Sequence, residues 1–323
     1  MYRTLRRRIL TPSMSETKPS VRAFHEKTAE STELLETIGR MFVTGYGYAA
    51  ESRRPLDVEP LLEELPVRFR GFAYEGAAMG FAVRDGLPLG GRGGVRQFLT
   101  GRAAAHDYMV YVGVGWALAR VPRFRWRAMT ASVTDDLLRW LVLDGYGFHQ
   151  AYFRPDEYVH GHHREASFPW PADGPQWYAD RVIDQGIGRA LWFVAGTDPT
   201  VVADLIDKFP ESRHADLYSG AGLAATYAGG VDEDELRAFW DRAGEHRPHV
   251  AQGSAFGAGA RVQAGLVVPH NELATRVFWG MGVEETNDVS ARHRPLGPVG
   301  GDVPAYEVWR RRIADEFRAL GRG

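Results

Sequence analysis

Residues 181–194 read RVIDQGIGRALWFV, and the two glycines of this stretch, Gly186 and Gly188, decide the fold. They stand in the middle of a segment whose apolar residues recur at helical spacing. A glycine in a helix interior costs roughly 1 kcal/mol relative to alanine, so a pair of glycines needs compensation, which close approach of a second backbone supplies. The stretch therefore predicts a helix that crosses a neighbouring helix at its glycines.

The same glycine motif occurs six times in the chain of 323 residues. Successive copies are 37, 32, 41, 34 and 33 residues apart, and their first glycines are Gly76, Gly113, Gly145, Gly186, Gly220 and Gly253. A period of about 34 residues is typical of stacked helical hairpins, in which each unit buries its apolar face against its neighbours. The sequence predicts an all-α fold of helical-hairpin repeats, either TPR-like or closed into an α/α toroid.

The repeats predict one domain over residues 21–323, with a capping helix at 21–48 and repeats at about 65–320. A basic N-terminal arm is expected at residues 1–20. With 44% hydrophobic residues, a chain of this length can bury one large core. No stretch approaches the roughly 18 uncharged apolar residues of a membrane span, so we expect no transmembrane segment.

Composition narrows the class of partner. The formal net charge is −2, from 39 basic and 41 acidic residues, and this balance argues against binding to nucleic acid. The absence of cysteine removes disulfides, thiolate metal ligands and a cysteine nucleophile. We expect a cytoplasmic location, and the sequence indicates no particular cofactor and no metal site.

Polar residues stand directly before the first glycine in five of the six copies, within helices that are otherwise apolar. They are Glu75, Asp144, Gln185, Ser219 and Gln252. Because equivalent positions of a repeat line up in space, they predict a polar stripe. The stripe extends to side chains one residue earlier and one turn later, namely Tyr74, Asp184, Tyr218, His149 and Arg189. It has two interpretations: an internal hydrogen-bond network that fixes helix register, or a surface that lines a ligand.

Large side chains stand three positions after the first glycine in most copies. They are Met79, Trp116, Phe148, Arg189, Leu223 and Phe256. Aromatic walls with a few polar groups suit an apolar ligand, and Trp192 and Phe193 could add to them. We expect catalytic roles for Glu75, Asp144, His149 and Arg189. The expected substrate-binding residues are Tyr74, Trp116, Phe148, Asp184, Gln185, Tyr218, Gln252, Phe256 and Glu272.

Other clusters have structural explanations that we favour. His160, His162 and His163 could ligate a metal but lie in a long loop. The acidic run at residues 232–235 resembles the acidic box that protonates polyenes in some toroid cyclases, yet acids at a helix start also meet the helix dipole favourably. A further candidate combines His270, Asn271 and Glu272 with Tyr306, Glu307 and the arginines at 310–312 near the C-terminus. Its His270 and Glu272 could act as an acid/base pair or as helix-cap residues. The glycine-rich loop at 86–94 lacks the ending of a phosphate-binding loop.

Eight segments along the chain resemble, in order, an uncharacterised protein family found in enediyne polyketide biosynthetic gene clusters. They are LRRRILTP (5–12), FRGFAYEGAAMG (69–80), VGVGWALAR (112–120), DGYGFHQAYF (144–153), DQGIGRALWFV (184–194), ADLYSGAGLAATYAGG (215–230), RPHVAQGSAFGAGAR (247–261) and PAYEVWRRRI (304–313). The resemblance implies a step in converting a polyene into the enediyne core. It also implies a hydrophobic polyene ligand and partner biosynthetic proteins.

Three hypotheses of function follow. The first is an enzyme, or an essential enzyme subunit, that holds a long polyene in an aromatic groove with a polar stripe. The second is a non-catalytic helical-repeat scaffold for partner proteins, and the third is a toroid cyclase that acts on a polyene. A scaffold should expose the stripe on an open face, whereas an enzyme should enclose it.

Overall fold

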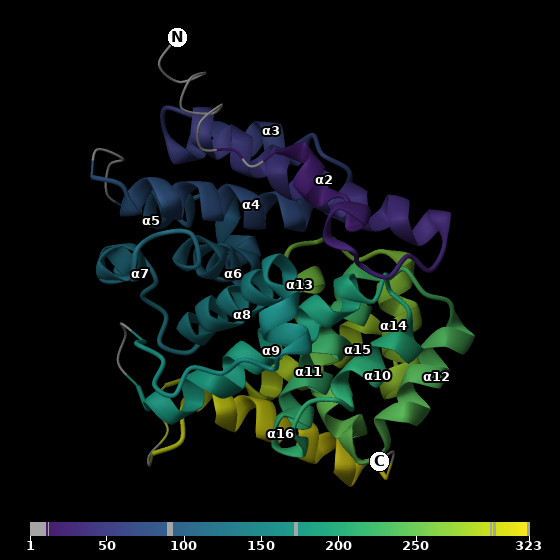
Figure 1. Ribbon diagram of the computed structural model, residues 1–323. Helices are drawn as coiled ribbons and strands as arrows, with labels where there is room; N and C mark the ends of the chain where they lie inside the picture. Colours follow the sequence, from purple (N-terminus) through teal and green to yellow (C-terminus); the bar gives the residue numbers. More distant parts are fainter. Residues whose placement is uncertain are drawn as a thin grey trace.

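The computed structural model describes residues 11, 13–88, 93–170, 174–297, 299 and 302–321. Within these residues the chain forms 15 α-helices and no β-strand, so the predicted all-α class is confirmed for them (Figure 1). The helices are α2 (Ala29–Glu51), α3 (Glu59–Glu63), α4 (Val67–Gly86), α5 (Gly94–Phe98), α6 (Asp107–Leu118), α7 (Trp126–Thr130), α8 (Leu141–Phe153), α9 (Ala179–Val194), α10 (Pro199–Ile206), α11 (Glu211–Ala228), α12 (Glu233–Ala243), α13 (Arg247–Gln263), α14 (Pro269–Trp279), α15 (Val283–His293) and α16 (Ala305–Ala319).

Short helical turns connect these elements. Eight are 3₁₀ turns and one, η7, is a π turn. They are η1 (Met14–Thr17), η2 (Pro19–Arg22), η3 (Pro55–Val58), η4 (Arg102–His106), η5 (Arg123–Arg125), η6 (Leu138–Trp140), η7 (Asp156–His160), η8 (Gln176–Tyr178) and η9 (Gly244–His246).

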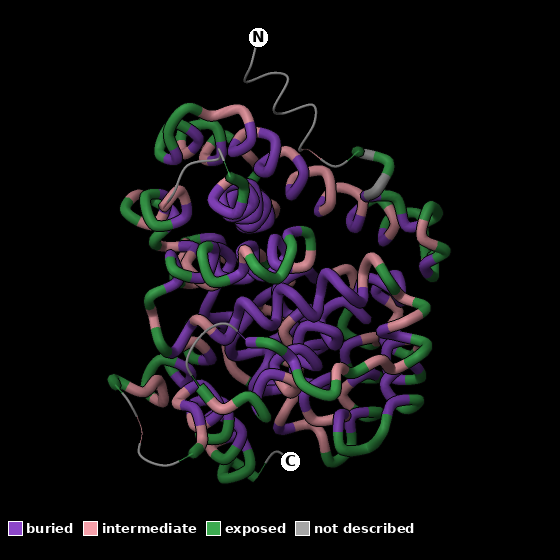
Figure 2. The backbone as a smooth tube through the Cα atoms, turned by 60° about the vertical axis from the view of Figure 1, so that its left-hand side comes forward, coloured by how far each residue is buried: buried purple, intermediate pink, exposed green. Residues whose placement is uncertain are grey.

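The glycine helices pack on one another in chain order. Helix α2 contacts α4, and the series continues through α6, α8, α9 and α11 to α13. The six first glycines of the motif lie inside α4, α6, α8, α9, α11 and α13, as predicted. These helices are buried around most of their circumference (Figure 2).

The glycines bring the backbones of neighbouring helices into direct contact. The place where a β-carbon would stand on Gly113 is occupied by the carbonyl oxygen of Glu75, and on Gly186 by that of Asp144. In each case the oxygen belongs to the residue that directly precedes the first glycine of the previous glycine helix. Second glycines do the same in the other direction, since Gly188 faces the carbonyl of Leu217. Such close approach places Cα–H groups against carbonyl oxygens, a weak attraction that recurs at helix interfaces.

A second row of helices covers part of the stack. Helices α10, α12 and α14 alternate with the later glycine helices in sequence, and they contact one another in order on the right of Figure 1. Side chains cap two of them: Asp198 accepts hydrogen bonds at the start of α10 and Asp232 at the start of α12. The earlier glycine helices are joined instead by short helices, 3₁₀ turns and the π turn η7.

The N-terminal region differs from its expected bounds. The helix predicted at residues 21–48 runs over Ala29–Glu51, because Thr28 and Ser31 form a capping box that starts it there. Residues 1–10 and 12 of the expected basic arm lie outside the described residues, and η1 and η2 follow them. Residues 89–92 of the glycine-rich loop also lie outside.

The last helix closes the core through buried ion pairs. Arg310 of α16 donates to Asp216 of α11 at 2.7 Å, and Arg181 of α9 donates to Glu307 of α16 at 2.6 Å. Asp216, Glu307 and Arg310 are each less than 5% exposed, so their mutual pairing offsets the cost of burying charge. None of the helices in the described part of the chain has the length and apolar composition that a membrane crossing requires.

Gly220→Ala should destabilise the protein by more than about 1–3 kcal/mol, the usual range for an overpacked core. The new β-carbon would overlap the carbonyl oxygen of Gln185, whereas β-carbons in proteins stay at least 3.0 Å from such atoms. Gly259→Ala is the matched control. Gly259 also lies inside a helix, but the nearest atom to its new β-carbon would be Asn287 Oδ1 at 3.5 Å, an ordinary contact distance. Urea unfolding should give a large loss for the first variant and little change for the second. Equal stability of the two would contradict the close packing.

Candidate functional site

The stack places the residues before the first glycines side by side in the interior. Gln185 Nε2 donates to Asp144 Oδ2 at 2.6 Å, and Ser219 Oγ donates to Gln252 Oε1 at 2.7 Å. Each pair joins neighbouring glycine helices, and all four side chains are at most 1% exposed. This part of the predicted stripe is therefore an internal hydrogen-bond network.

Glu75, the first member of the stripe, faces a cavity instead. The cavity has a volume of about 60 Å³ and lies among α2, α4, α6, α8 and α9. Its lining residues are mostly apolar or aromatic, and they are Thr17, Leu35, Ile38, Gly39, Phe42, Val43, Phe72, Glu75, Met79, Trp116, Arg120, Phe148, Tyr152, Phe153, Arg189 and Phe193. The expected residues Glu75, Trp116, Phe148 and Arg189 thus meet at one site.

The geometry of the glycine helices explains this convergence. Met79, Trp116, Phe148 and Arg189 stand three residues after the first glycines of four consecutive glycine helices. Residues four positions further along lie on the same helix face, and they supply Arg120, Tyr152 and Phe193. Since the glycine contacts hold the helices in register, one face of each helix contributes to the same wall.

The Glu75 carboxyl is buried with one oxygen unsatisfied. The residue is 2% exposed, and Oε1 has no hydrogen-bond partner within the described structure. Burial raises the pKa of Glu75 to about 7, while Arg189 opposes the rise and Asp144 adds to it. The indole N–H of Trp116 also lowers this pKa, although it does not reach hydrogen-bond geometry. Glu75 can therefore hold or release a proton near neutral pH.

Arg189 links Glu75 to the buried network. Its guanidinium forms an ion pair with Asp144 and lies 5.2 Å from the ring centre of Phe148. Asp144 in turn accepts the hydrogen bond from Gln185, whose Nε2 also reaches the hydroxyl of Tyr306 at 3.1 Å. Asp144 is 0% exposed and does not line the cavity, so it acts on the site through Arg189.

His149 is buried beside the cavity rather than in its wall. Its ring stacks on Phe153 at 4.4 Å, and neither ring nitrogen has a hydrogen-bond partner in the described structure. Burial lowers the pKa of His149 to about 3, and the positive charge of Arg120 lowers it further. A neutral imidazole of this kind is a weak base, which argues against the catalytic role expected for it.

The remaining expected site residues lie elsewhere. Tyr74 donates to Glu63 Oε1 at 2.7 Å, Asp184 pairs with Arg213 at 2.6 Å, and Tyr218 stacks on His246. Neighbouring residues of a helix point about 100° apart. These three side chains stand one residue before the polar stripe and therefore point away from it. Gln252 belongs to the internal network, and Phe256 packs on Trp309. Glu272 accepts from the backbone N–H of Val283 at 3.2 Å.

Where the structure describes them, the other clusters noted in the sequence are not arranged as metal or acid/base sites. The described residues contain no group of three or more acidic or histidine side chains placed to hold a metal, including the histidines at 160, 162 and 163. In the run at 232–235, Asp232 and Glu235 form a capping box for α12, and Glu235 also pairs with Lys27. His270 interacts with the backbone carbonyl of Tyr227 at 3.1 Å.

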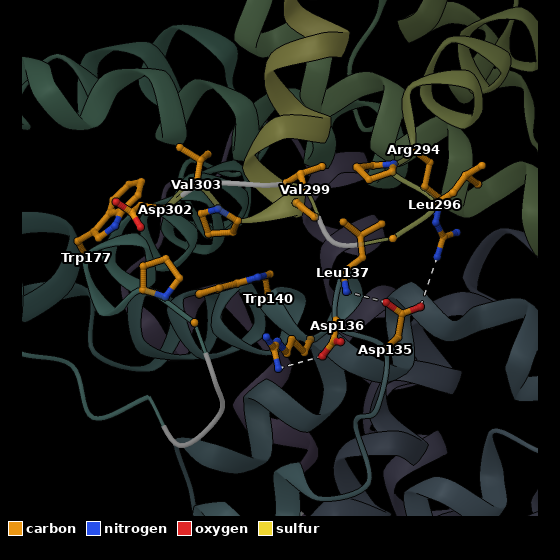
Figure 3. Close-up of a pocket in the computed structure, with 17 residues that line it drawn as sticks. Asp135, Asp136, Leu137, Trp140, Trp177, Arg294, Leu296, Val299, Asp302 and Val303 are labelled. Atoms are coloured by element: carbon orange, nitrogen blue, oxygen red, sulfur yellow. Dashed lines mark hydrogen bonds and ion pairs between the residues drawn. The ribbon is translucent and has the colours of Figure 1, made fainter.

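A larger hollow of about 980 Å³ lies on the surface near α16 (Figure 3). Trp140 and Trp177 stand on one side of it, with Arg294 and Leu296 across from them. Four of its five charged side chains are paired with one another, since Arg139 contacts Asp136 at 3.0 Å and Arg294 contacts Asp135 at 3.5 Å, and the fifth is Asp302. None of the residues expected at the site lines this hollow, so we place the candidate site at Glu75.

Sequence reasoning missed several residues around Glu75. Arg120 and Tyr152 occupy the position seven residues after a first glycine, and reading that position in each copy would have identified them. Tyr227 occupies the same position in α11, and its buried hydroxyl has no partner in the described structure and fills the space beside Gly71. Gly71 and Glu75 are one turn apart on α4, so this hydroxyl lies on the Glu75 face.

Comparison with known proteins identifies a family. A family model described as "Protein of unknown function (DUF1702)" matches residues 1–317, and the chain belongs to this family. No curated protein and no solved structure matches the chain.

Glu75→Gln should remove a pH dependence of stability. The pKa of Glu75 is about 7 in the folded protein against 4.5 for an ordinary glutamate, so the folded state binds more protons between these values. Because Glu75→Gln removes this one group, the stability of wild type relative to Glu75→Gln should fall as pH rises from 4.5 to 7 and then level off, by roughly 3 kcal/mol in all. Urea unfolding at several pH values should show this fall in the stability difference between wild type and Glu75→Gln, and the same fall in the difference between the control Glu272→Gln and Glu75→Gln. An identical pH profile in all three proteins would exclude the raised pKa.

Proposed function

We propose that this member of the DUF1702 family is an enzyme, or an essential subunit of one, that binds a long unsaturated hydrocarbon and transfers a proton through Glu75. The observation that carries the proposal is the carboxyl of Glu75, which is 2% exposed, has an unpartnered oxygen and faces an aromatic cavity. Perturbed carboxyl groups in apolar cavities are typical of catalytic acids.

The surroundings of Glu75 suit proton donation to an alkene. With a pKa of about 7, an appreciable fraction of the carboxyl is protonated at neutral pH. Transfer of that proton to a carbon of the ligand leaves a carboxylate, and the Arg189 guanidinium provides a positive charge beside it. Trp116 and Phe148, whose ring centres are 5.0 Å apart, present π-faces that stabilise positive charge developing on the hydrocarbon.

The proposal places this reaction in the biosynthesis of an enediyne core from a polyene. The support is the ordered resemblance of segments between Leu5 and Ile313 to proteins encoded in enediyne polyketide gene clusters. A cytoplasmic location, supported by the absence of cysteine, and contacts with partner biosynthetic proteins belong to the same proposal.

We also infer that the fold is a helical repeat with a period of about 34 residues. The contacts that support this inference are equivalent from one unit to the next. Gly145, Gly186, Gly220 and Gly253 each face the carbonyl of the residue that precedes the first glycine of the previous helix.

A long ligand requires the cavity to open. A volume of about 60 Å³ holds only roughly four to six water molecules. Thr17 of η1 contributes to the lining, and it occupies the space beside Gly39 of α2. The short η1–η2 segment is held to the body partly by Arg22, which lies 4.1 Å from the ring centre of Phe153. We infer that this segment moves to admit the chain.

The two alternative functions, a scaffold and a toroid cyclase, require different properties of the same residues. A scaffold needs no buried acid, and the burial of the Glu75 carboxyl beside an aromatic cavity therefore supports an enzyme. A toroid cyclase would use an acid to protonate the polyene, and Glu75 suits that role better than residues 232–235, which cap α12. Analysis of the product, cyclic or linear, separates the cyclase from the more general proposal.

Glu75→Gln should lower enediyne production by at least about 100-fold, the lower range for loss of a general acid. The assay is complementation of a deletion strain, and the purified variant should still quench its tryptophan fluorescence on addition of a conjugated polyene. Glu272→Gln, an acid-to-amide change outside the cavity, is the matched control and should restore production. Full production by folded Glu75→Gln would exclude the acid role, and unchanged products in the deletion strain would exclude the enediyne pathway.

Polyene binding should speed hydrogen exchange in residues 17–24. The amides of Val21 and Phe24 donate backbone hydrogen bonds within this segment, to Lys18 and Pro19. When the segment leaves the body of the protein, its short helical turns lose the packing that stabilises them, and these hydrogen bonds open. Mass spectrometry should show faster exchange there at saturating ligand and unchanged exchange in the buried helix α11. Saturation without any change in residues 17–24 would mean that the ligand enters elsewhere.

A further inference from the structure

One end of the cavity is open and positively charged. Arg120 is the exposed member of the lining residues, and Tyr152 and Phe153 next to it are half-buried. Glu75 and Arg189, which line the same cavity, are buried. The site therefore has a mouth, marked by Arg120, and a buried part, marked by Glu75.

Arg120 has no counter-ion among the described residues. Its guanidinium makes no hydrogen bond or ion pair in the part of the chain that the structure describes. It follows the last residue of α6, Leu118, by only two positions, so the helix holds its backbone in place beside the cavity. An arginine that is placed at a cavity mouth and left without an acid is available to a ligand.

Further positive charge surrounds the same mouth. Arg22 lies 5.1 Å from the ring centre of Tyr152 and 4.1 Å from that of Phe153. The pKa of His149, which burial lowers most, is lowered further by Arg120, Arg22 and Arg154, and no acidic group opposes them. Arg154 is paired with Glu157, which leaves Arg120 as the guanidinium best placed to meet an anion.

We propose that the ligand is a polyene with a terminal carboxylate, bound with the carboxylate at Arg120 and the unsaturated chain along the aromatic wall toward Glu75. This inference rests on the proposed function and adds the chemical class of the ligand. A planar guanidinium matches a carboxylate through two parallel hydrogen bonds, and the single charge of Arg120 balances a single negative charge.

Such a ligand would be held in one register. Apolar walls alone let a chain slide, whereas a polar group fixed at one end determines which carbon lies at the other. With the carboxylate at Arg120, a defined carbon of the chain stands beside Glu75. The proton would then be delivered to one position of the polyene.

The test compares an acid with its neutral ester. The probes are cis-parinaric acid, a conjugated tetraene fatty acid whose fluorescence rises in apolar surroundings, and its methyl ester. Wild-type protein should bind the acid about tenfold more tightly than the ester, the difference expected for one charge-assisted interaction at an exposed mouth. Arg120→Gln should bind both probes with the affinity that wild type shows for the ester.

Arg127→Gln is the matched control, because Arg127 is exposed on α7, outside the cavity, and the substitution removes the same charge. It should keep the preference for the acid. Equal binding of acid and ester by wild type, or an unchanged preference in folded Arg120→Gln, would overturn the carboxylate assignment and leave the polyene site standing. Failure of wild type to bind either probe would overturn both.

Discussion

The contact of a glycine with the carbonyl of a neighbouring helix is the constraint on which the rest of this structure depends. It recurs from α4 to α13, and each contact fixes both the distance between two helices and their register along the axis. A β-carbon at these positions has no space, and a helix that moved outward to make space would lose its packing against the next helix. The glycines are unfavourable for each helix taken alone, and the stack compensates for them through continuous burial of their apolar faces.

The same constraint produces the candidate site. Because the helices are held in register, side chains at one position of the motif become neighbours in space. Where that position carries Trp116 and Phe148, it forms an aromatic wall, and where it carries Arg189, it supplies a charge. The residues before the glycines follow the same rule, so Gln185 meets Asp144 and Ser219 meets Gln252. Glu75 differs because its counterpart on the next helix is Val112, which offers no hydrogen bond. An acid without a partner is the result.

Much of this arrangement could be read from the sequence. The glycine spacing predicted helices that meet at glycines, and the position three residues later predicted the aromatic wall. The sequence did not distinguish Tyr74 and Asp184 from the stripe, because it shows adjacency along the chain, and only the helix rotation separates them. It also gave no indication that Arg310 and Glu307, far away in α16, bind Asp216 and Arg181, since those pairs depend on where the C-terminal helix docks. The larger hollow beside Trp177 is formed by distant connecting segments that have no repeat to predict them.

The glycine contacts have a consequence for the chemistry of Glu75. The carbonyl of this residue faces Gly113 of α6, and the glycine that follows it, Gly76, faces the carbonyl of Phe42 of α2. The backbone on both sides of Glu75 is therefore in direct contact with neighbouring helices. A backbone held in this way has little freedom to move when the carboxyl loses its proton, so the adjustment falls to side-chain torsions. For the proton transfer that we propose, a backbone held in place by glycine contacts would preorganise the acid and keep its reorganisation energy small.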